Sequence, residues 1–346
     1  MHPSPDRVRV VPSKLVWVAK ETIDDLLSQG TDCYRLASSP GCWVERFGAA
    51  CLVSHDAGLP GGLIDEICLR PDLGPPLEAI YARKLVQGPG SSDAPKKVWS
   101  SGDHHPANHP LKESRPEIAT HPPGDSTSTN CKDRYLTKEA GLFYEVDFSL
   151  GYSCGLFLDQ RANRAKVRSF QPERVLNCFS FTCSFSVCGA SVGARTTSLD
   201  LSKQSLTRGR RNFALNGLAE TGHRFLADDV FDVLPRLARR GETFDVIILD
   251  PPTFSRGRGG RVFRAGNDLP ALVEMALACA APSAKLLVST NCSRLPQDAL
   301  GKLLRRSLKV PLRMESPEAP SDFSGGTGAS TLWLSLRDRD RSDSKR

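Results

Sequence analysis

Apolar and polar residues follow a regular pattern from about Gly141 to the C-terminal end of the chain. Short apolar runs rich in Val, Ile and Leu predict buried strands, and apolar residues spaced three or four positions apart predict helices. The predicted strands are 174–179, 196–200, 225–226, 244–249, 285–289 and 331–336. The predicted helices are 160–170, 184–192, 203–216, 230–240, 268–280 and 297–308. This alternation predicts an α/β fold in which helices cover both faces of a parallel sheet.

The hydrophobic pattern is weaker before this region. Short apolar runs and a candidate helix from Pro76 to Leu85 predict a small α+β domain, and Leu142–Phe148 with Gly155–Leu158 predicts a hairpin. The stretch between this candidate helix and the hairpin is rich in Pro, Ser, Gly, Asp and His and lacks apolar periodicity, which predicts disorder. The predicted division is a small α+β domain (1–86), a low-complexity, disordered insertion (87–135), the α/β domain (136–337) and a charged tail (338–346).

The composition is that of a globular chain, with 39% apolar and 25% charged residues. No apolar run reaches the roughly 18 residues that a membrane span needs, and Met1–Pro5 lacks the apolar core of a signal peptide, which predicts a cytoplasmic protein. Eleven cysteines without Cys-x-x-Cys spacing predict buried free thiols. His104, His105 and His109 lie in a loose polar tract, so no metal site is predicted.

The net charge of +7 favours a polyanionic partner without defining one. Its distribution is more informative, because four arginines fall within nine residues. They are Arg256, Arg258, Arg261 and Arg264. A solvated surface loop would explain such a cluster in most proteins. This cluster closely follows a predicted strand end, where parallel sheets bind ligands, and it therefore predicts phosphate contacts beside a ligand site.

Acidic residues follow two neighbouring strands of the predicted sheet. Asp200 ends the second strand, where the ribose hydroxyls of a nucleoside cofactor would arrive. Asp229 follows the third strand, close to where an adenine ring would lie. Each residue also has a simpler interpretation as a helix cap, and the spacing alone does not decide between the two.

The segment Asp250-Pro251-Pro252-Thr253-Phe254 is a more specific signal. Two prolines directly after an apolar strand impose a rigid, extended exit, which holds the Asp250 carboxylate at the edge of the sheet. Phe254 offers a ring on which a base can stack. Together with the arginines that follow, this segment predicts a pocket for a nucleic-acid base.

These segments resemble the bacterial large-subunit ribosomal RNA methyltransferase family, whose members methylate cytosine at carbon 5 or guanine at ring nitrogen 7. The matching stretches, in the family's order and at its spacing, are Gly155–Arg161, Val175–Ser180, Ser198–Asp200, Ala227–Phe231, Phe244–Pro252 and Leu287–Ser289. The resemblance covers about 141 to 294. It implies a Rossmann-like class I methyltransferase fold, S-adenosyl-L-methionine as cofactor and large-subunit ribosomal RNA as partner, and it leaves a homodimer open.

The resemblance also implies roles for single residues. The implied cofactor-binding residues are Asp159, Gln160, Arg161, Asn177, Phe179, Ser180, Asp200 and Asp229. The candidate catalytic residues are Asp250, Pro251, Pro252, Phe254 and Cys292, and the candidate RNA-binding residues are the four arginines of the loop.

The sequence departs from the family pattern at two places. Two glycines usually follow the segment that ends at Thr182, whereas this chain has Cys183 and Ser184, whose side chains would crowd the methionine end of the cofactor. Methylation of cytosine carbon 5 needs a thiolate, and Cys292 is one residue away from the position of the family's cysteine, which Asn291 takes. Asn291 favours the guanine-directed branch, which needs only a positioned lone pair.

Two further interpretations stay open. The chain could be an RNA-binding relative whose activity has been weakened by the change at Cys183 and Ser184. It could also methylate a substrate other than RNA, in which case the arginine loop would have no phosphate to bind.

Overall fold

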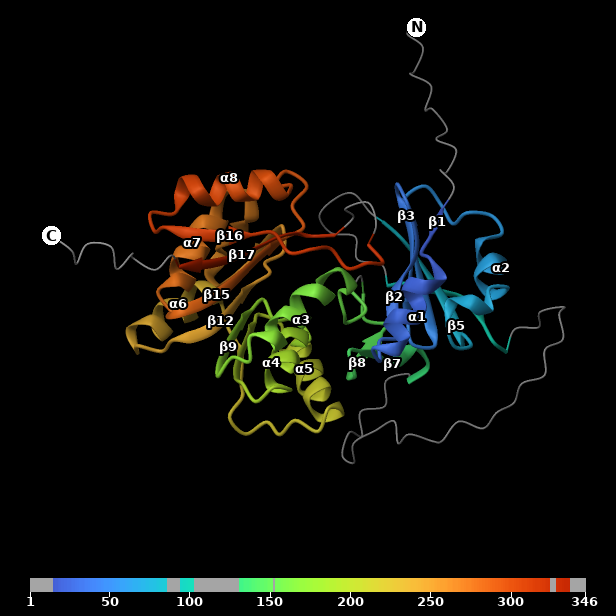
Figure 1. Ribbon diagram of the computed structural model, residues 1–346, viewed down its shortest axis with the longest axis horizontal. Helices are drawn as coiled ribbons and strands as arrows, with labels where there is room; N and C mark the ends of the chain where they lie inside the picture. Colours follow the sequence, from blue (N-terminus) through green and yellow to red (C-terminus); the bar gives the residue numbers. More distant parts are fainter. Residues whose placement is uncertain (1–14, 86–93, 103–130, 152, 324–327, 337–346) are drawn as a thin grey trace, which may run out of the picture. The chain divides into compact units, whose positions relative to one another are not determined.

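The computed structural model describes residues 15–85, 94–102, 131–151, 153–323 and 328–336. The chain divides into two compact units, Met1–Gly155 and Leu156–Arg346, and each is described by itself (Figure 1). The boundary falls later than the start of the predicted α/β domain at residue 136, because the hairpin at 134–147 belongs to the first unit.

The first unit contains a six-stranded sheet with the strands in sequence order from β1 to β6. The strands are β1 Val16–Trp17, β2 Cys33–Ser39, β3 Cys42–Phe47, β4 Ala50–His55, β5 Ala79–Lys84 and β6 Lys96–Ser100. Helices α1 (Lys20–Ser28) and α2 (Leu63–Cys68) accompany the sheet, and Ile23 and Leu26 of α1 pack into its apolar core. A separate hairpin pairs β7 (Arg134–Glu139) with β8 (Leu142–Asp147).

Three local predictions differ from this arrangement. The candidate helix Pro76–Leu85 is the strand β5, whose first residues are buried between β4 and β6. Strand β6 lies inside the stretch predicted to be disordered, where pairing with β5 outweighs the polar composition of Lys96 and Lys97. The hairpin partner of β8 is the preceding strand β7, and residues 155–158 form no strand.

The second unit is built on a seven-stranded sheet with the order β11-β10-β9-β12-β15-β17-β16. Its strands are β9 Arg174–Cys178, β10 Arg195–Asp200, β11 Arg224–Ala227, β12 Phe244–Leu249, β15 Ala280–Thr290, β16 Leu312–Glu315 and β17 Ser330–Leu336. The helices are α3 Arg161–Ser169, α4 Ser184–Ala190, α5 Lys203–Leu215, α6 Val230–Arg239, α7 Ala265–Leu277 and α8 Gln297–Ser307. The first five strands along the chain run parallel, and β17 runs antiparallel to both of its neighbours.

Strand β12 shows how the sequence builds the core of this unit. Successive side chains of a strand point to opposite faces, so Val246 and Ile248 pack on one side and Ile247 and Leu249 on the other. The first face is covered by α3 and α4, and the second by α6, α7 and α8 (Figure 1). Helices on both faces of a mainly parallel sheet confirm the predicted α/β architecture.

The cysteines are free thiols in the described parts of the chain. Ten of the eleven cysteines are described as free, and nine of these ten are buried, as predicted. Within the same residues, no helix is long and apolar enough to cross a membrane. Nor do His, Cys, Asp and Glu side chains gather there as a metal site would require. The histidines 104, 105 and 109 lie outside the described residues.

Candidate cofactor and substrate site

The order of the sheet places two motifs side by side. Strands β10 and β11 extend the sheet on one side of β9, whereas the chain later returns to add β12 on its other side. Ligands of parallel sheets bind where the strand order reverses in this way, at the carboxyl ends of the strands. Cys178 at the end of β9 pairs with Leu249 at the end of β12. The loop that starts at Phe179 and the Asp250 motif therefore leave the sheet at the switch point as neighbours.

The loop after β9 has an unusual backbone. Phe179, Phe181 and Cys183 all adopt positive φ angles, of 57°, 47° and 61°. Residues with a Cβ pay about 1–2 kcal/mol for this conformation, so other contacts must hold the loop in place. Asp200 provides one of them, because its Oδ2 accepts a hydrogen bond of 2.8 Å from the backbone N–H of Phe181.

The second carboxylate oxygen of Asp200 is also bound to the backbone. Its Oδ1 accepts a hydrogen bond of 2.8 Å from the N–H of Ser202, which is the N-cap of α5. Burial raises the pKa of Asp200, and these two backbone hydrogen bonds oppose the rise. Each carboxylate oxygen has two lone pairs, so each can accept one more hydrogen bond from a ligand. The loop contact and a ribose contact are therefore compatible.

The side chain of Cys183 turns away from the sheet edge towards α5. It is fully buried, and a Cβ added to Gly209 of α5 would lie only 2.4 Å from its Sγ. Asn212 on the same helix donates a hydrogen bond of 2.9 Å to the carbonyl of Thr182. The missing glycine at position 183 is thus matched by a glycine at position 209, which leaves room for the thiol.

Asn177 is buried at the end of β9 and is only partly satisfied. Its Nδ2 donates to Ser186 Oγ at 2.9 Å, which fixes the orientation of the amide. Its Oδ1 is buried without a hydrogen-bond partner in the described structure. An unpaired buried carbonyl oxygen costs about 1–3 kcal/mol, so this atom is a candidate acceptor for a ligand group.

A cavity lies between the ends of β10 and β11 and the hairpin that follows β12. Its lining includes the carboxylates of Asp200 and Asp229 and the rings of Phe179, Phe231 and Phe263. Asp229 also caps α6, because its Oδ1 accepts from the N–H of Phe231 at 2.9 Å. The cap and the ligand interpretation of Asp229 therefore do not exclude one another. The cavity combines flat apolar walls with acceptors, which suits a nucleoside.

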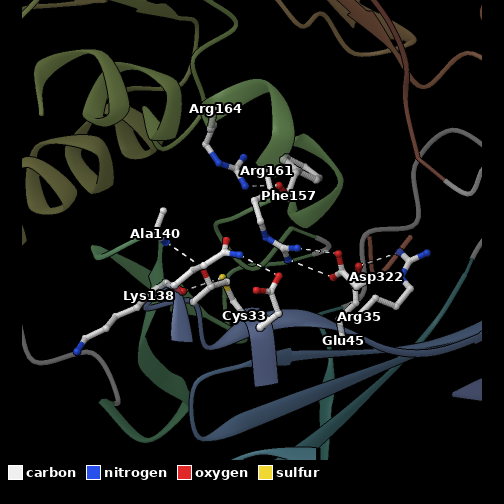
Figure 2. Close-up of polar contacts among 12 residues, drawn as sticks. Cys33, Arg35, Glu45, Lys138, Ala140, Phe157, Arg161, Arg164 and Asp322 are labelled. Atoms are coloured by element: carbon white, nitrogen blue, oxygen red, sulfur yellow. Dashed lines mark hydrogen bonds and ion pairs between the residues drawn. The ribbon is translucent and has the colours of Figure 1, made fainter. Parts of the chain in front are cut away.

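The residues before and at the start of α3 have partners inside the protein. The Arg161 guanidinium donates two hydrogen bonds to the Asp322 carboxylate, at 2.7 and 3.1 Å. Figure 2 shows this ion pair and Arg164 donating to the carbonyl of Phe157. Gln160 binds Ser289, and Asp159 Oδ2 accepts from the N–H of Ala329. Gln160 and Arg161 were expected to contact the cofactor. Both side chains are buried and bound to other residues of the protein.

Asp250 directly follows β12 and is half-buried among polar side chains. Burial raises its pKa to about 6, and the nearby carboxylate of Asp159 adds to the rise. A hydrogen bond with Ser289 and the positive charge of Arg164 act in the opposite direction. Phe254, four residues further on, leaves 44% of its surface exposed, as a ring that stacks on a base requires.

The structure places Cys292 apart from this polar group. Its side chain is 8% exposed and belongs to the apolar cluster formed by β12, β15 and the helices α6, α7 and α8. The preceding residue, Asn291, is exposed at the end of β15. Both residues follow the end of the strand, where the thiol is buried in the core and the amide stays exposed.

The arginine loop forms a short hairpin of β13 (Phe254–Arg256) and β14 (Val262–Arg264). Arg256 and Arg264 are exposed. Arg261 lines the cavity, with its Nη1 3.2 Å from Asp232 and 3.5 Å from Asp229. The hairpin can approach Asp229 because Gly257 has no side chain: a Cβ there would lie 2.2 Å from Asp229 Oδ2.

Several residues that shape the site were missed in the sequence. Gly209 lies in the middle of a predicted helix, and an isolated glycine there signals a close approach. Phe231 and Phe263 line the cavity, and Asp322 holds Arg161. No pattern in the sequence points to Asp322, because it lies 161 positions from its partner.

The fold and the site define a class I methyltransferase domain, in which a Rossmann-like sheet carries a cavity lined by carboxylates and aromatic rings at its switch point. The chain belongs to the S-adenosylmethionine-dependent methyltransferase family, whose pattern matches residues 91–334. Members of this family use S-adenosyl-L-methionine as the methyl donor.

Two curated relatives resemble the chain in sequence. The ribosomal RNA large subunit methyltransferase of Deinococcus radiodurans is 40% identical over 166 residues, which cover 46% of this chain and 40% of the relative. The ribosomal RNA large subunit methyltransferase I of Cronobacter sakazakii is 31% identical over 245 residues, 69% of this chain and 54% of the relative. The chain spans about half the length, or less, of these relatives.

Solved structures share the fold. A methyltransferase named SMU.776, crystallised with S-adenosylhomocysteine, superposes with a TM-score of 0.70 at 22% identity, over 94% of this chain and 83% of that one. The methyltransferase of Agrobacterium tumefaciens gives a TM-score of 0.64 at 19% identity, over 89% and 91% of the two chains. Both likenesses extend over most of this chain and support the class I fold.

Proposed function

We propose that the chain transfers a methyl group from S-adenosyl-L-methionine to a base of large-subunit ribosomal RNA. The observation that carries the proposal is the switch point itself, where a cavity with two carboxylates and three aromatic rings adjoins the Asp250 motif and an arginine hairpin. The relatives named above act, by their names, on large-subunit ribosomal RNA. Such a substrate implies a cytoplasmic protein.

The residues present fit the cofactor. The proposed contacts are the Asp200 carboxylate to the ribose hydroxyls, Asp229 to the adenine amino group, and Asn177 with the backbone of Phe179 and Ser180 to the methionine part. The unpaired Oδ1 of Asn177 and the remaining lone pairs of Asp200 support this assignment. Cys183 does not oppose it, because its thiol is buried against Gly209. When bound, the cofactor supplies a methyl group activated by a positively charged sulfur.

Gln160 and Arg161 act indirectly in this proposal. Arg161 holds the start of α3 through Asp322, and Gln160 contacts Ser289 beside Asp250. Asp159 is bound to the backbone at Ala329 and keeps its place near Asp250. These residues stabilise the protein around the site, and the residues that contact the cofactor directly lie in the loops after β9, β10 and β11.

The substrate base is proposed to lie against Asp250, Pro251, Pro252 and Phe254. The prolines fix the backbone, the exposed Phe254 ring stacks on the base, and the ionised Asp250 carboxylate accepts hydrogen bonds from its amino or imino groups. Arg256, Arg258 and Arg264 would bind the flanking phosphates, while Arg261, which is bound to Asp229 and Asp232, would close the cofactor cavity.

Position and burial of Cys292 favour a ring nitrogen over cytosine carbon 5 as the methylated atom. A carbon-5 reaction requires a thiolate to add to the ring, and Cys292 faces the apolar core. A ring nitrogen could use its own lone pair to accept the methyl group that a bound cofactor would supply, and it would need no thiolate from the protein. The protein then needs only to orient the two reactants.

The test is methyl transfer from isotope-labelled cofactor to unmodified large-subunit ribosomal RNA, followed by mass spectrometry of the nucleosides. We expect a methylated purine, with an unchanged rate in Cys292→Ala. Loss of all transfer in Cys292→Ala, in a protein that still binds cofactor, would establish the covalent carbon-5 route instead. Absence of transfer to any RNA by the folded wild-type chain would refute the proposed function.

A further inference from the structure

Four buried polar side chains form one continuous chain of hydrogen bonds behind Asp250. Trp333 Nε1 donates to Asn163 Oδ1, Asn163 Nδ2 donates to Gln160 Oε1, and Gln160 Nε2 donates to Ser289 Oγ, each at 2.8 Å. Ser289 in turn is hydrogen-bonded to Asp250. The four side chains are at most 3% exposed, so water does not compete for these bonds.

The chemistry of the two ends gives this chain a direction. An indole N–H can only donate, so the Asn163 oxygen must face Trp333 and its amino group must face Gln160. The same reasoning turns the Gln160 amino group towards Ser289. Ser289 Oγ thereby accepts from Gln160, and its own proton is left for Asp250. Every donor points towards Asp250, which is the only member that accepts without donating.

The chain also joins elements that are distant in sequence. Trp333 lies on β17, Asn163 on α3, Ser289 on β15, and Asp250 follows β12. Strands β12, β15 and β17 are successive neighbours in the sheet. Four elements are therefore locked together by one network, and each bond depends on the orientation of the one before it. Such networks are cooperative, and a partly broken one is costly.

We propose that Trp333, Asn163 and Gln160 are positioning residues that act through Ser289: they fix one hydrogen bond to the buried side of the Asp250 carboxylate and leave its other lone pairs to the substrate base. The inference rests on the proposed function for the role of the base, but the network itself does not. Without the hydrogen bond from Gln160, the Ser289 hydroxyl could rotate and donate its proton to another acceptor.

The inference makes a prediction about the ionisation of Asp250. The carboxyl loses its proton with a pKa of about 6 in its present surroundings. Ser289 stabilises the charged form, so removal of its hydroxyl must raise the pKa of Asp250. The charged groups that face Asp250, Asp159 and Arg164, are unchanged by this substitution. Ser289→Ala should therefore move the titration midpoint of Asp250 upwards from its present value of about 6.

Trp333→Phe tests the direction of the chain from its far end. Without the indole donor, the Asn163 and Gln160 amides can turn over, and the Gln160 oxygen then attracts the Ser289 proton away from Asp250. We expect a rise in the pKa of Asp250 that is smaller than in Ser289→Ala. A purely structural role of Trp333 predicts a lower melting temperature with an unchanged titration. Asn163→Ala frees the Gln160 amide in the same way and replaces Trp333→Phe if that variant does not fold.

The measurement is a titration of the aspartate side-chain carboxyls of the full chain by carbon-13 NMR, without cofactor. Asp250→Asn identifies the signal of Asp250. Ser54→Ala is the matched control, because Ser54 is a fully buried, hydrogen-bonded serine in the other unit. An unchanged Asp250 titration in Ser289→Ala, or in both Trp333→Phe and Asn163→Ala, overturns the proposal. Methyl transfer is scored separately, so the predicted shifts in a protein that methylates no RNA would refute the function alone.

Discussion

The loop after β9 and the hairpin after β12 leave the same edge of the sheet as neighbours, but they are built in opposite ways. The first, residues 179–183, places bulky residues at positive φ and holds them by buried contacts to Asp200, Asn212 and Gly209. The second, residues 254–264, has glycines at its positive φ angles and exposed arginines around them. The first loop is suited to hold one small molecule in one geometry, and the second to meet a large, variable polyanion.

Glycine is therefore not the only residue that can form a tight loop at a ligand site. A loop can keep its shape with Phe and Cys at positive φ when buried partners supply the energy. Such a loop depends on those partners and should fail when one is lost. A glycine-rich hairpin depends on its own backbone and should tolerate changes of its side chains. Substitutions in and around the two loops test this contrast.

The largest effect is expected for Asp200→Ala. This change removes the acceptor of the Phe181 N–H and, in the proposed function, of the ribose hydroxyls. Two hydrogen bonds to a charged group correspond to about 3 kcal/mol, which predicts a roughly 100-fold loss of cofactor affinity. Isothermal titration calorimetry with S-adenosylhomocysteine measures it. Asp298→Ala is the control, because it removes an equally charged, exposed side chain on α8, and Asp298 does not line the cavity. Wild-type affinity in Asp200→Ala would show that the loop does not depend on this carboxylate.

A smaller effect, on stability, is expected for Gly209→Ala. Alanine is the better helix former by about 1 kcal/mol, but its Cβ would collide with the buried thiol of Cys183. Overpacking of this kind costs about 1–3 kcal/mol, so the free energy of unfolding should fall in denaturant titrations. The double variant Cys183→Gly, Gly209→Ala should recover it, since the clash is then absent.

The same experiment has a matched control in α8. Gly301 is also a buried helical glycine, but a Cβ there would meet nothing closer than 3.7 Å. Gly301→Ala should therefore leave stability unchanged or raise it by up to about 1 kcal/mol. Equal effects of the two glycine substitutions, or no recovery in the double variant, would show that Cys183 and Gly209 are not coupled.

The contrast also explains what could be predicted from the sequence. Strands β12 and β15 carry continuous apolar runs, Val246–Leu249 and Leu286–Val288, so the sequence located both strands and their carboxyl ends. The N-cap of α5 is also a local feature, because the Ser202 side chain accepts a hydrogen bond from the N–H of Ser205, three positions further on. Strand β5 was taken for a helix because its short run of Ala, Ile and Tyr fits either structure, and only its pairing with β4 decides.

The partners of the site residues were beyond the reach of local patterns. The family resemblance implied that Gln160 and Arg161 contact the cofactor, whereas packing gives them Ser289 and Asp322, which are 129 and 161 positions away. The substitution at Cys183 was visible as a loss of glycine. Its compensation at Gly209 was not, because the two residues meet only after β10 and α5 have folded against the loop. Long-range pairs of this kind need the fold before they can be named.

The smallest effect per residue is expected in the arginine hairpin. Arg256→Gln and Arg264→Gln each remove one exposed cation, and each should weaken binding of ribosomal RNA roughly three- to tenfold at moderate salt. The slope of the logarithm of the binding constant against that of the salt concentration should fall by about 1 for each lost phosphate contact. Filter binding over a range of salt concentrations measures both quantities. Affinity for S-adenosylhomocysteine should stay the same, because these two arginines do not line the cavity.

Arg306→Gln is the control for charge alone, because Arg306 is exposed on α8 and does not belong to the hairpin. If all three variants lower the salt slope equally, RNA binding follows the net charge of the chain and not the hairpin. If the two hairpin variants instead lose affinity for S-adenosylhomocysteine, the hairpin is part of the cofactor site. The assignment of the cofactor to the first loop and of RNA to the hairpin would then be wrong. A selective loss of RNA binding would assign the two loops to two different ligands at one edge of the sheet.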